Sequence, residues 1–128
     1  MLKLMYITNS PEVASIADGA GVDRIFIDLE QYGKEKRQKN WDSVKSKHSV
    51  SDIPKVKAAV KNAQIFVRTD PIFDGFSDEL EGVLACEPDV VMLPYFKTVR
   101  EVETFIKAVD GRATTSLLLE TREAAEQI

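Results

Sequence analysis

The sequence is poor in several features that mark common classes of protein. Its single cysteine, Cys86, excludes an internal disulfide framework, and because this residue ends a helical pattern we expect a packed thiol rather than a nucleophile. There is no excess of positive charge: the formal net charge is −4, which argues against a nucleic-acid partner. No apolar run approaches the length of a membrane span, and the N-terminus lacks the layout of a signal peptide. We therefore expect a cytoplasmic protein without a membrane partner.

The remaining composition is ordinary for a soluble globular protein, with 44% hydrophobic and 30% charged residues. A chain of 128 residues can bury a core without the help of disulfides. We therefore expect residues 1–128 to form a single domain or a part of a larger one.

Short apolar runs alternate with helical patterns along the chain. The runs predict strands at residues 2–8, 22–30, 64–70, 90–95 and 113–119. Helix start signals lie between them, such as Ser10-Pro11 and the capping-box pattern from Thr98 to Glu101. No Asn-Gly hairpin signal separates neighbouring runs, so the sequence predicts parallel strands joined by outer helices.

The ends of these strands carry the functional information, because parallel α/β proteins bind ligands beyond the carboxyl ends of their strands. Glu30, Arg68, Pro94 and Glu120 lie at four such ends and would share one rim if the strands are neighbours. A closed (β/α)8 barrel takes eight units and roughly 250 residues. The chain therefore predicts an incomplete TIM (β/α)8-type barrel of about five parallel strands.

Two carboxylates end the second predicted strand. Asp28 and Glu30 lie on one face of it because side chains alternate along a strand. Burying both is costly unless they are paired or bound to a metal. Arg68, at the end of the next strand, can bind a carboxylate with its planar fork. The group is a candidate catalytic site, and a structural ion pair is the alternative.

Glu120 follows the apolar run 117–119. A lone carboxylate in this position requires a cation, which Arg68 or a divalent metal such as Mg²⁺ could supply. The alternative is a carboxylate that merely favours the positive end of the next helix.

Residues 31–50 interrupt the alternation as a long loop, and residues 31–40 within it are polar and mostly basic. Because it follows the carboxyl end of a strand, we expect a lid or a substrate-binding loop, with a solvated charge run as the alternative. Lys34 and Arg37 could bind an anion if the loop folds inward. His48, the only histidine, is a further catalytic candidate, and a plain surface residue is its alternative.

Four segments resemble, in the correct order, the HpcH/HpaI aldolase and citrate lyase β-subunit family. Residues 22–30 resemble its strand ending in Asp-x-Glu, and residues 66–68 its strand ending in a substrate-binding arginine. Residues 90–98 resemble the strand with its Val/Leu-Pro-x-x-x-Thr signature, and residues 118–124 the segment with a metal-binding glutamate. Together the segments cover most of the chain from residue 22 onward.

The resemblance implies a barrel of the phosphoenolpyruvate/pyruvate-binding type. It implies Mg²⁺ or another divalent metal, and cleavage or formation of a carbon–carbon bond through an enolate from a small oxo acid or an acyl-CoA. Glu120 would bind the metal and Arg68 the enolate oxygen, with Pro94 beside the substrate.

The sequence departs from the family pattern at two places. The second metal carboxylate, an aspartate on the next strand, would lie beyond Ile128. The histidine that follows Asp-x-Glu in the aldolase branch is replaced by Gln31, which leaves His48 as a substitute base.

Three functions therefore stay open. The first is a fragment of a metal-dependent carbon–carbon lyase, inactive alone. The second is a non-catalytic half-barrel that binds a metal or an anion, and the third is a flavodoxin-like binding domain. An uncovered sheet edge also predicts self-association into a homo-oligomer.

Overall fold

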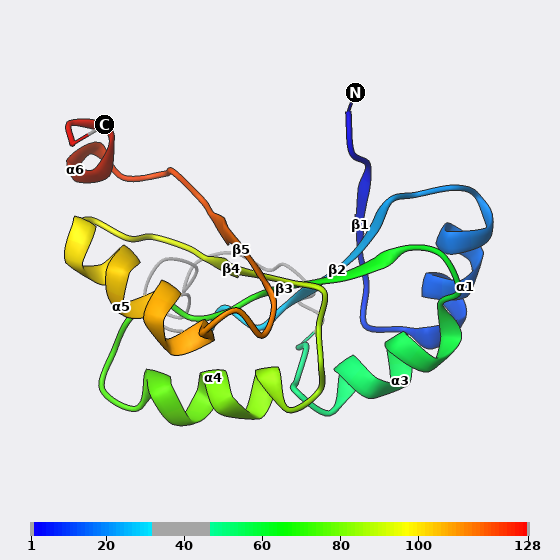
Figure 1. The fold of residues 1–128 in the computed structure, drawn as a ribbon. Coiled ribbons are helices and arrows are strands. Elements are labelled where there is room, and N and C mark those ends of the chain that lie inside the picture. The colour runs from blue at the N-terminus through cyan, green and yellow to red at the C-terminus, as the bar shows by residue number, and fades with distance from the viewer. Residues whose placement is uncertain (1, 32–46, 128) are drawn as a thin grey trace, which may run out of the picture.

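The computed structural model describes residues 2–31 and 47–127, which form one curved parallel sheet with helices along its outer side (Figure 1). The strands are β1 (Met5–Ile7), β2 (Arg24–Asp28), β3 (Gln64–Arg68), β4 (Val90–Leu93) and β5 (Thr114–Leu117). The helices are α1 (Pro11–Gly19), α3 (Asp52–Ala59), α4 (Phe76–Leu84), α5 (Val99–Val109) and α6 (Arg122–Ala125). The alternation of strands and helices predicted from the sequence is confirmed.

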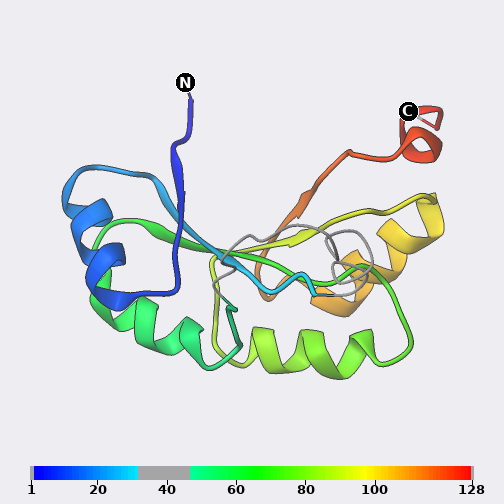
Figure 2. The same cartoon turned by 180° about the vertical axis from the view of Figure 1, so that it is seen from behind.

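The strand order identifies the architecture. The five strands lie in the order β1-β2-β3-β4-β5, and every neighbouring pair is parallel. Figure 2 shows from behind that α1, α3, α4 and α5 follow the outside of the curve in the same order. A flavodoxin-like sheet would have the order 2-1-3-4-5, so that alternative is wrong. The molecule is an open segment of a (β/α)8-type barrel.

The main core lies between the sheet and the helices. Alternate residues of β2, such as Ile25 and Ile27, point outward and are fully buried. They pack with Val67, Val91 and the inner faces of the helices. The sheet and the helices are both apolar where they meet, because helices cover the outer face of every central strand.

The opposite, concave face carries a second and smaller cluster. Phe26 and Phe66 stack with ring centroids 5.1 Å apart, and Val90 and Met92 complete the buried set. The guanidinium of Arg68 lies 5.5 Å from the centroid of the Phe26 ring. The strand alternation that buries this layer also places the residues two positions further along each strand directly above it, at the rim.

Carboxylates fix the opposite, amino ends of the strands. Asp18 of α1 accepts hydrogen bonds from the three successive amides of residues 61–63, at 2.7–3.1 Å for its shortest contacts. Asp23 accepts from the amide of Leu4 at 2.8 Å, and Asp89 from that of Ile65 at 2.7 Å. Each bond anchors the start of a neighbouring strand, so these acids have a structural role.

The two outer strands differ from the sequence-based expectation. The run before Glu120 was expected to be buried, but Leu117 and Leu119 are 43% and 48% exposed. β1 is exposed as well, with Ile7 at 59%. Both strands lie at the edges of the sheet, so each has a neighbouring strand on one side only among the described residues. No helix in the described part of the chain is long and apolar enough to cross a membrane.

Candidate functional site

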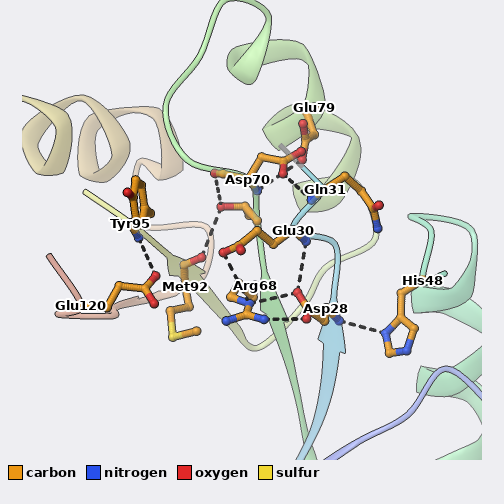
Figure 3. A network of polar contacts seen from close by, with 11 residues as sticks. Asp28, Glu30, Gln31, His48, Arg68, Asp70, Glu79, Met92, Tyr95 and Glu120 are labelled. Carbon is orange, nitrogen blue, oxygen red and sulfur yellow. Dashed lines mark hydrogen bonds and ion pairs between the residues drawn. The ribbon is translucent and has the colours of Figure 1, made fainter. Parts of the chain in front are cut away.

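Asp28 and Arg68 form the centre of the rim (Figure 3). They are direct partners in the register of β2 and β3. Arg68 donates from Nε to Asp28 Oδ1 at 2.9 Å and from Nη2 to Oδ2 at 2.6 Å. The side chains are only 20% and 15% exposed. The pairing predicted from strand alternation is therefore present, in the two-point geometry that a guanidinium and a carboxylate prefer.

Glu30 adds a second carboxylate to the same group. Its residue is 4% exposed, and its Oε2 lies 3.8 Å from Nε of Arg68. The amide of Glu30 donates to Oδ1 of Asp28 at 3.1 Å, which ties the strand end to the ion pair. The hydrogen bonds that Arg68 donates to Asp28 raise the pKa of Arg68, and the charges of Asp28, Glu30 and Glu120 act in the same direction. Arg68 is therefore a permanent cation at the rim.

Glu120 lies on the far side of the rim and faces β4. Its Oε1 accepts a hydrogen bond from the amide of Tyr95 at 2.9 Å, and the residue is exposed. Tyr95 has a φ of 51°, a left-handed conformation that is uncommon outside glycine. This turn directs its amide toward the carboxylate. The hydrogen-bond donor to Oε1 of Glu120 is thus a backbone amide, and Arg68 interacts with Glu120 through its charge.

Pro94 is buried between β4 and this turn, at the rim position that the sequence predicted. Lys34 and Arg37, the two loop residues predicted to bind an anion, lie outside the described residues.

His48 has a position that the sequence did not predict. It is 8% exposed, so the surface alternative is wrong. Its Nδ1 accepts a hydrogen bond from the amide of Asp28 at 2.9 Å. The amide of Thr8, just after β1, donates to the carbonyl of Phe26 in β2. Because a strand turns its backbone groups to the same neighbour at every second residue, the amide of Asp28 also points toward the side of β1. His48 therefore supplies the acceptor that a longer β1 would have offered, and it holds the backbone of Asp28 in place.

A further polar group, missed by the sequence analysis, lies beside Glu30. The amide of Gln31 donates to Oδ1 of Asp70 at 2.6 Å, and the amide of Asp70 lies 3.4 Å from Oε1 of Glu79. Burial and the neighbouring carboxylate of Asp70 raise the pKa of Glu79 to about 7. The sequence offered one signal for this group. Asp70 lies two residues after Arg68, and because side chains alternate along a strand, the two side chains are expected on the same face.

The described residues do not form a metal centre by themselves. Nowhere in residues 2–31 and 47–127 do three or more histidine, cysteine, aspartate or glutamate side chains gather in a way that could hold a metal ion. Glu120 is one carboxylate with one oxygen already bonded to an amide. The carboxylates at the rim of the sheet hold and orient the cationic guanidinium of Arg68. A fixed guanidinium in this position suits the binding of an anionic ligand.

Comparisons with known proteins agree with this architecture. The family model described as HpcH/HpaI aldolase/citrate lyase matches residues 3–118. The structure of an HpcH/HpaI aldolase from Desulfitobacterium hafniense DCB-2 is similar with a TM-score of 0.60 and 11% identity, over 97% of this chain. An HpcH/HpaI aldolase/citrate lyase family protein from Burkholderia cenocepacia J2315 is similar with a TM-score of 0.60 and 16% identity, over 96% of this chain.

The chain spans less than half of these two solved structures, 44% and 45% of their respective lengths. At these identities the likeness concerns the fold alone. A search of curated proteins finds no match.

Proposed function

The chain belongs to the HpcH/HpaI aldolase/citrate lyase family, and we propose from this premise that it supplies five βα units of a carbon–carbon lyase. The substrate would be a small oxo acid or an acyl-CoA that reacts through an enolate. The proposal rests on one observation above all, the clamped guanidinium of Arg68 at the carboxyl ends of the strands.

The geometry of the clamp suits the stabilisation of an oxyanion. Asp28 occupies Nε and Nη2 of Arg68, and Nη1 contacts no acceptor among the described residues. Nη1 can therefore donate to the oxygen on which negative charge develops as the carbon–carbon bond breaks. A fixed donor of this kind typically contributes about 10²–10³ in kcat. Asp28 keeps the guanidinium in place, so little reorganisation is needed during the reaction.

Glu30 and His48 support the same group from two sides. Glu30 places a second negative charge near Nε of Arg68, and His48 holds the backbone of Asp28. In this arrangement Nδ1 of His48 is an acceptor bonded to an amide, which does not suit a direct attack on a substrate proton by that nitrogen. We therefore propose a positioning role for His48 rather than that of the base.

A divalent metal such as Mg²⁺ remains part of the proposal for the whole enzyme, with Glu120 as one ligand. Mg²⁺ in proteins is typically bound by one or two carboxylates together with water and substrate oxygens. The described residues bring only Glu120 to this place, with its Oε1 accepting from an amide. The fit is incomplete among the described residues, so we assign no step to a metal.

Isothermal titration with oxalate, an enolate mimic, tests the proposal in the presence and absence of Mg²⁺. We expect binding to the unmodified chain and at least a tenfold loss in R68Q, because the donor to the anion is removed. R100Q is the matched control, since Arg100 is an exposed arginine of α5. An absence of heat with oxalate under both conditions would contradict a catalytic role for this chain.

The second candidate function is a half-barrel that binds an anion or a metal without turnover. The clamped guanidinium of Arg68 favours it, because a fixed cation can bind an anion without any further catalytic group. Because the first candidate is also expected to be inactive as this chain alone, the two are separated by the metal: oxalate binding that depends on Arg68 but is unchanged by Mg²⁺ would support this alternative over the first.

We also propose that the open edges mediate self-association into a homo-oligomer. The edge strands β1 and β5 present exposed apolar residues, including Ile7 and Leu117. Unpaired strand edges of this kind readily pair with another chain. Size-exclusion chromatography with light scattering tests this, and a monomer at high protein concentration would contradict it.

A further inference from the structure

Two arginines and two phenylalanines form a repeated arrangement on the concave face of the sheet. Phe26 and Phe66 are direct partners in the register of β2 and β3, and their rings stack with centroids 5.1 Å apart and 22° between the ring planes. The guanidinium of Arg68 lies over the ring of Phe26, and that of Arg24 lies over the ring of Phe66. Both guanidiniums are 5.5 Å from the ring centroid, and each contacts the phenylalanine of the neighbouring strand.

Each arginine also has a hydrogen-bond partner directly opposite it in the register of the two strands. Arg68 donates from Nε and Nη2 to Asp28, at 2.9 and 2.6 Å. Arg24 donates from Nε to Oε1 of Gln64 at 3.2 Å. The same two strands thus hold two guanidiniums, each by a contact at its edge and a contact at its face. The arginine at the carboxyl ends of the strands differs in having a charged partner that binds it at two points.

Hydrogen bonds at one edge do not by themselves fix the plane of a guanidinium. The two bonds to Asp28 set the direction of the Arg68 side chain, but the group can still tilt about the line that joins the two side chains. A ring against its face limits this tilt, because a cation is attracted to the negative face of the ring and stacks on it. Phe26 is 6% exposed and stacks on Phe66, which is 2% exposed, so packing holds the ring itself in place.

We propose that Phe26 is a positioning residue for the anion-binding arginine: its ring holds the plane of the Arg68 guanidinium, while Asp28 holds the edge. The remaining N–H groups of Arg68 then keep one direction toward an anionic ligand. A donor held in this way stabilises developing charge without reorganisation. The inference rests on the proposed function for the class of ligand, but the contact between Phe26 and Arg68 exists without it.

A role in packing alone is the alternative, because Phe26 belongs to the small buried cluster on the concave face. The two roles make different demands on the ring. Packing depends on shape and volume, whereas holding a cation depends on the negative charge of the ring face. Replacement of Phe26 by pentafluorophenylalanine separates the two, since it keeps a ring of similar shape but reverses the charge of its face.

Nuclear magnetic resonance relaxation of the Arg68 Nε–H in the chain without ligand tests the positioning directly. We expect the order parameter of this group to fall when Phe26 is replaced by pentafluorophenylalanine, because the guanidinium is then repelled by the ring. The same replacement of Phe105, which is fully buried in the main core, is the matched control and should leave the order parameter unchanged. F26L removes the ring altogether and should lower the order parameter as well. Thermal denaturation checks that each variant is folded.

Isothermal titration with oxalate tests the consequence for binding. We expect an affinity about two- to fivefold weaker in the pentafluorophenylalanine variant of Phe26, and an unchanged affinity in that of Phe105. An order parameter of Arg68 equal to that of the unmodified chain in both Phe26 variants would overturn the proposal. If the unmodified chain does not bind oxalate, the proposed function fails, while the order parameter still decides the role of Phe26.

Discussion

Asp28 and Arg68 lie opposite each other in the register of β2 and β3 and share two hydrogen bonds, of 2.9 and 2.6 Å, at the rim of the sheet. A second arginine–carboxylate pair, Arg112 with Glu81, has the same two-point geometry at 2.8 and 2.7 Å. The side chains of Arg68 and Asp28 are 20% and 15% exposed, and those of Arg112 and Glu81 are 43% and 55% exposed. The two pairs differ mainly in burial, which allows a direct comparison.

We predict that D28N lowers the free energy of unfolding by about 2 kcal/mol, because it removes the nearer counter-charge of a partly buried guanidinium and leaves only Glu30 at 3.8 Å. E81Q is the matched control and should change stability little, since solvent screens an exposed pair. Urea denaturation measures both variants. Equal losses in the two would show that burial does not decide the strength of these pairs.

A second prediction concerns His48. H48A removes the acceptor of the Asp28 amide and should cost about 1–3 kcal/mol, the penalty of an unsatisfied buried donor. H48N keeps an oxygen close to the place of Nδ1 and should recover much of this loss. Thermal denaturation of both variants checks the prediction. A similar loss in H48N and H48A would mean that packing of the ring, rather than the hydrogen bond, is what matters.

A third prediction concerns the pH dependence of stability. The pKa of Glu79 is raised from 4.5 to about 7 in the folded chain, so the folded state binds a proton more tightly than the unfolded state. The resulting stabilisation is fully present below pH 4.5 and is lost as the pH rises through about 7. The full shift in pKa would correspond to about 3 kcal/mol. Because Glu79 is only partly buried, solvent screening reduces the decline that we expect across this window to about 2 kcal/mol.

E79Q should flatten this decline, because its side chain carries no charge at any pH. D78N serves as the control for the loss of a negative charge at the start of α4. Denaturant titrations at pH 5, 6, 7 and 8 measure the slope. Amide donors lower the pKa values of Asp18 and Asp52, so the stability that these groups contribute is lost as the pH falls from about 3.8 through their lower folded-state values, outside this window. An unchanged slope in E79Q would assign the decline to another group.

A fourth prediction uses two glycines at α4. Gly75 caps the helix with a φ of 98°, where a side chain is strained, whereas Gly82 is helical and has open space around its missing Cβ. G75A should destabilise the chain by about 1–2 kcal/mol through backbone strain. G82A should stabilise it by about 0.4–1 kcal/mol by restricting the unfolded chain. Thermal denaturation distinguishes the two, and stabilisation by G75A would contradict the assigned conformation.

The sequence by itself determined the local elements. The side chain of Ser10 caps α1, and Thr98 with Glu101 forms the predicted capping box of α5, because these bonds join residues three positions apart. Strand alternation was sufficient to place Asp28 on the same face as Glu30 and to make Arg68 a suitable partner. Such patterns act over a few residues and are visible without the rest of the fold.

Tertiary structure alone decided the remaining features. The contact of His48 with Asp28, that of Asp70 with Gln31, and that of Glu120 with Tyr95 each join segments 20–39 residues apart. Their donors are backbone amides, which every residue except proline possesses, so no sequence pattern points to them. The exposure of Leu117 was likewise decided by the tertiary structure. A run of leucines indicates a strand suited to burial, but burial requires a neighbour to pack against it. The sequence therefore specified the chemical groups at the rim, and only the placement of distant segments decided which of them meet.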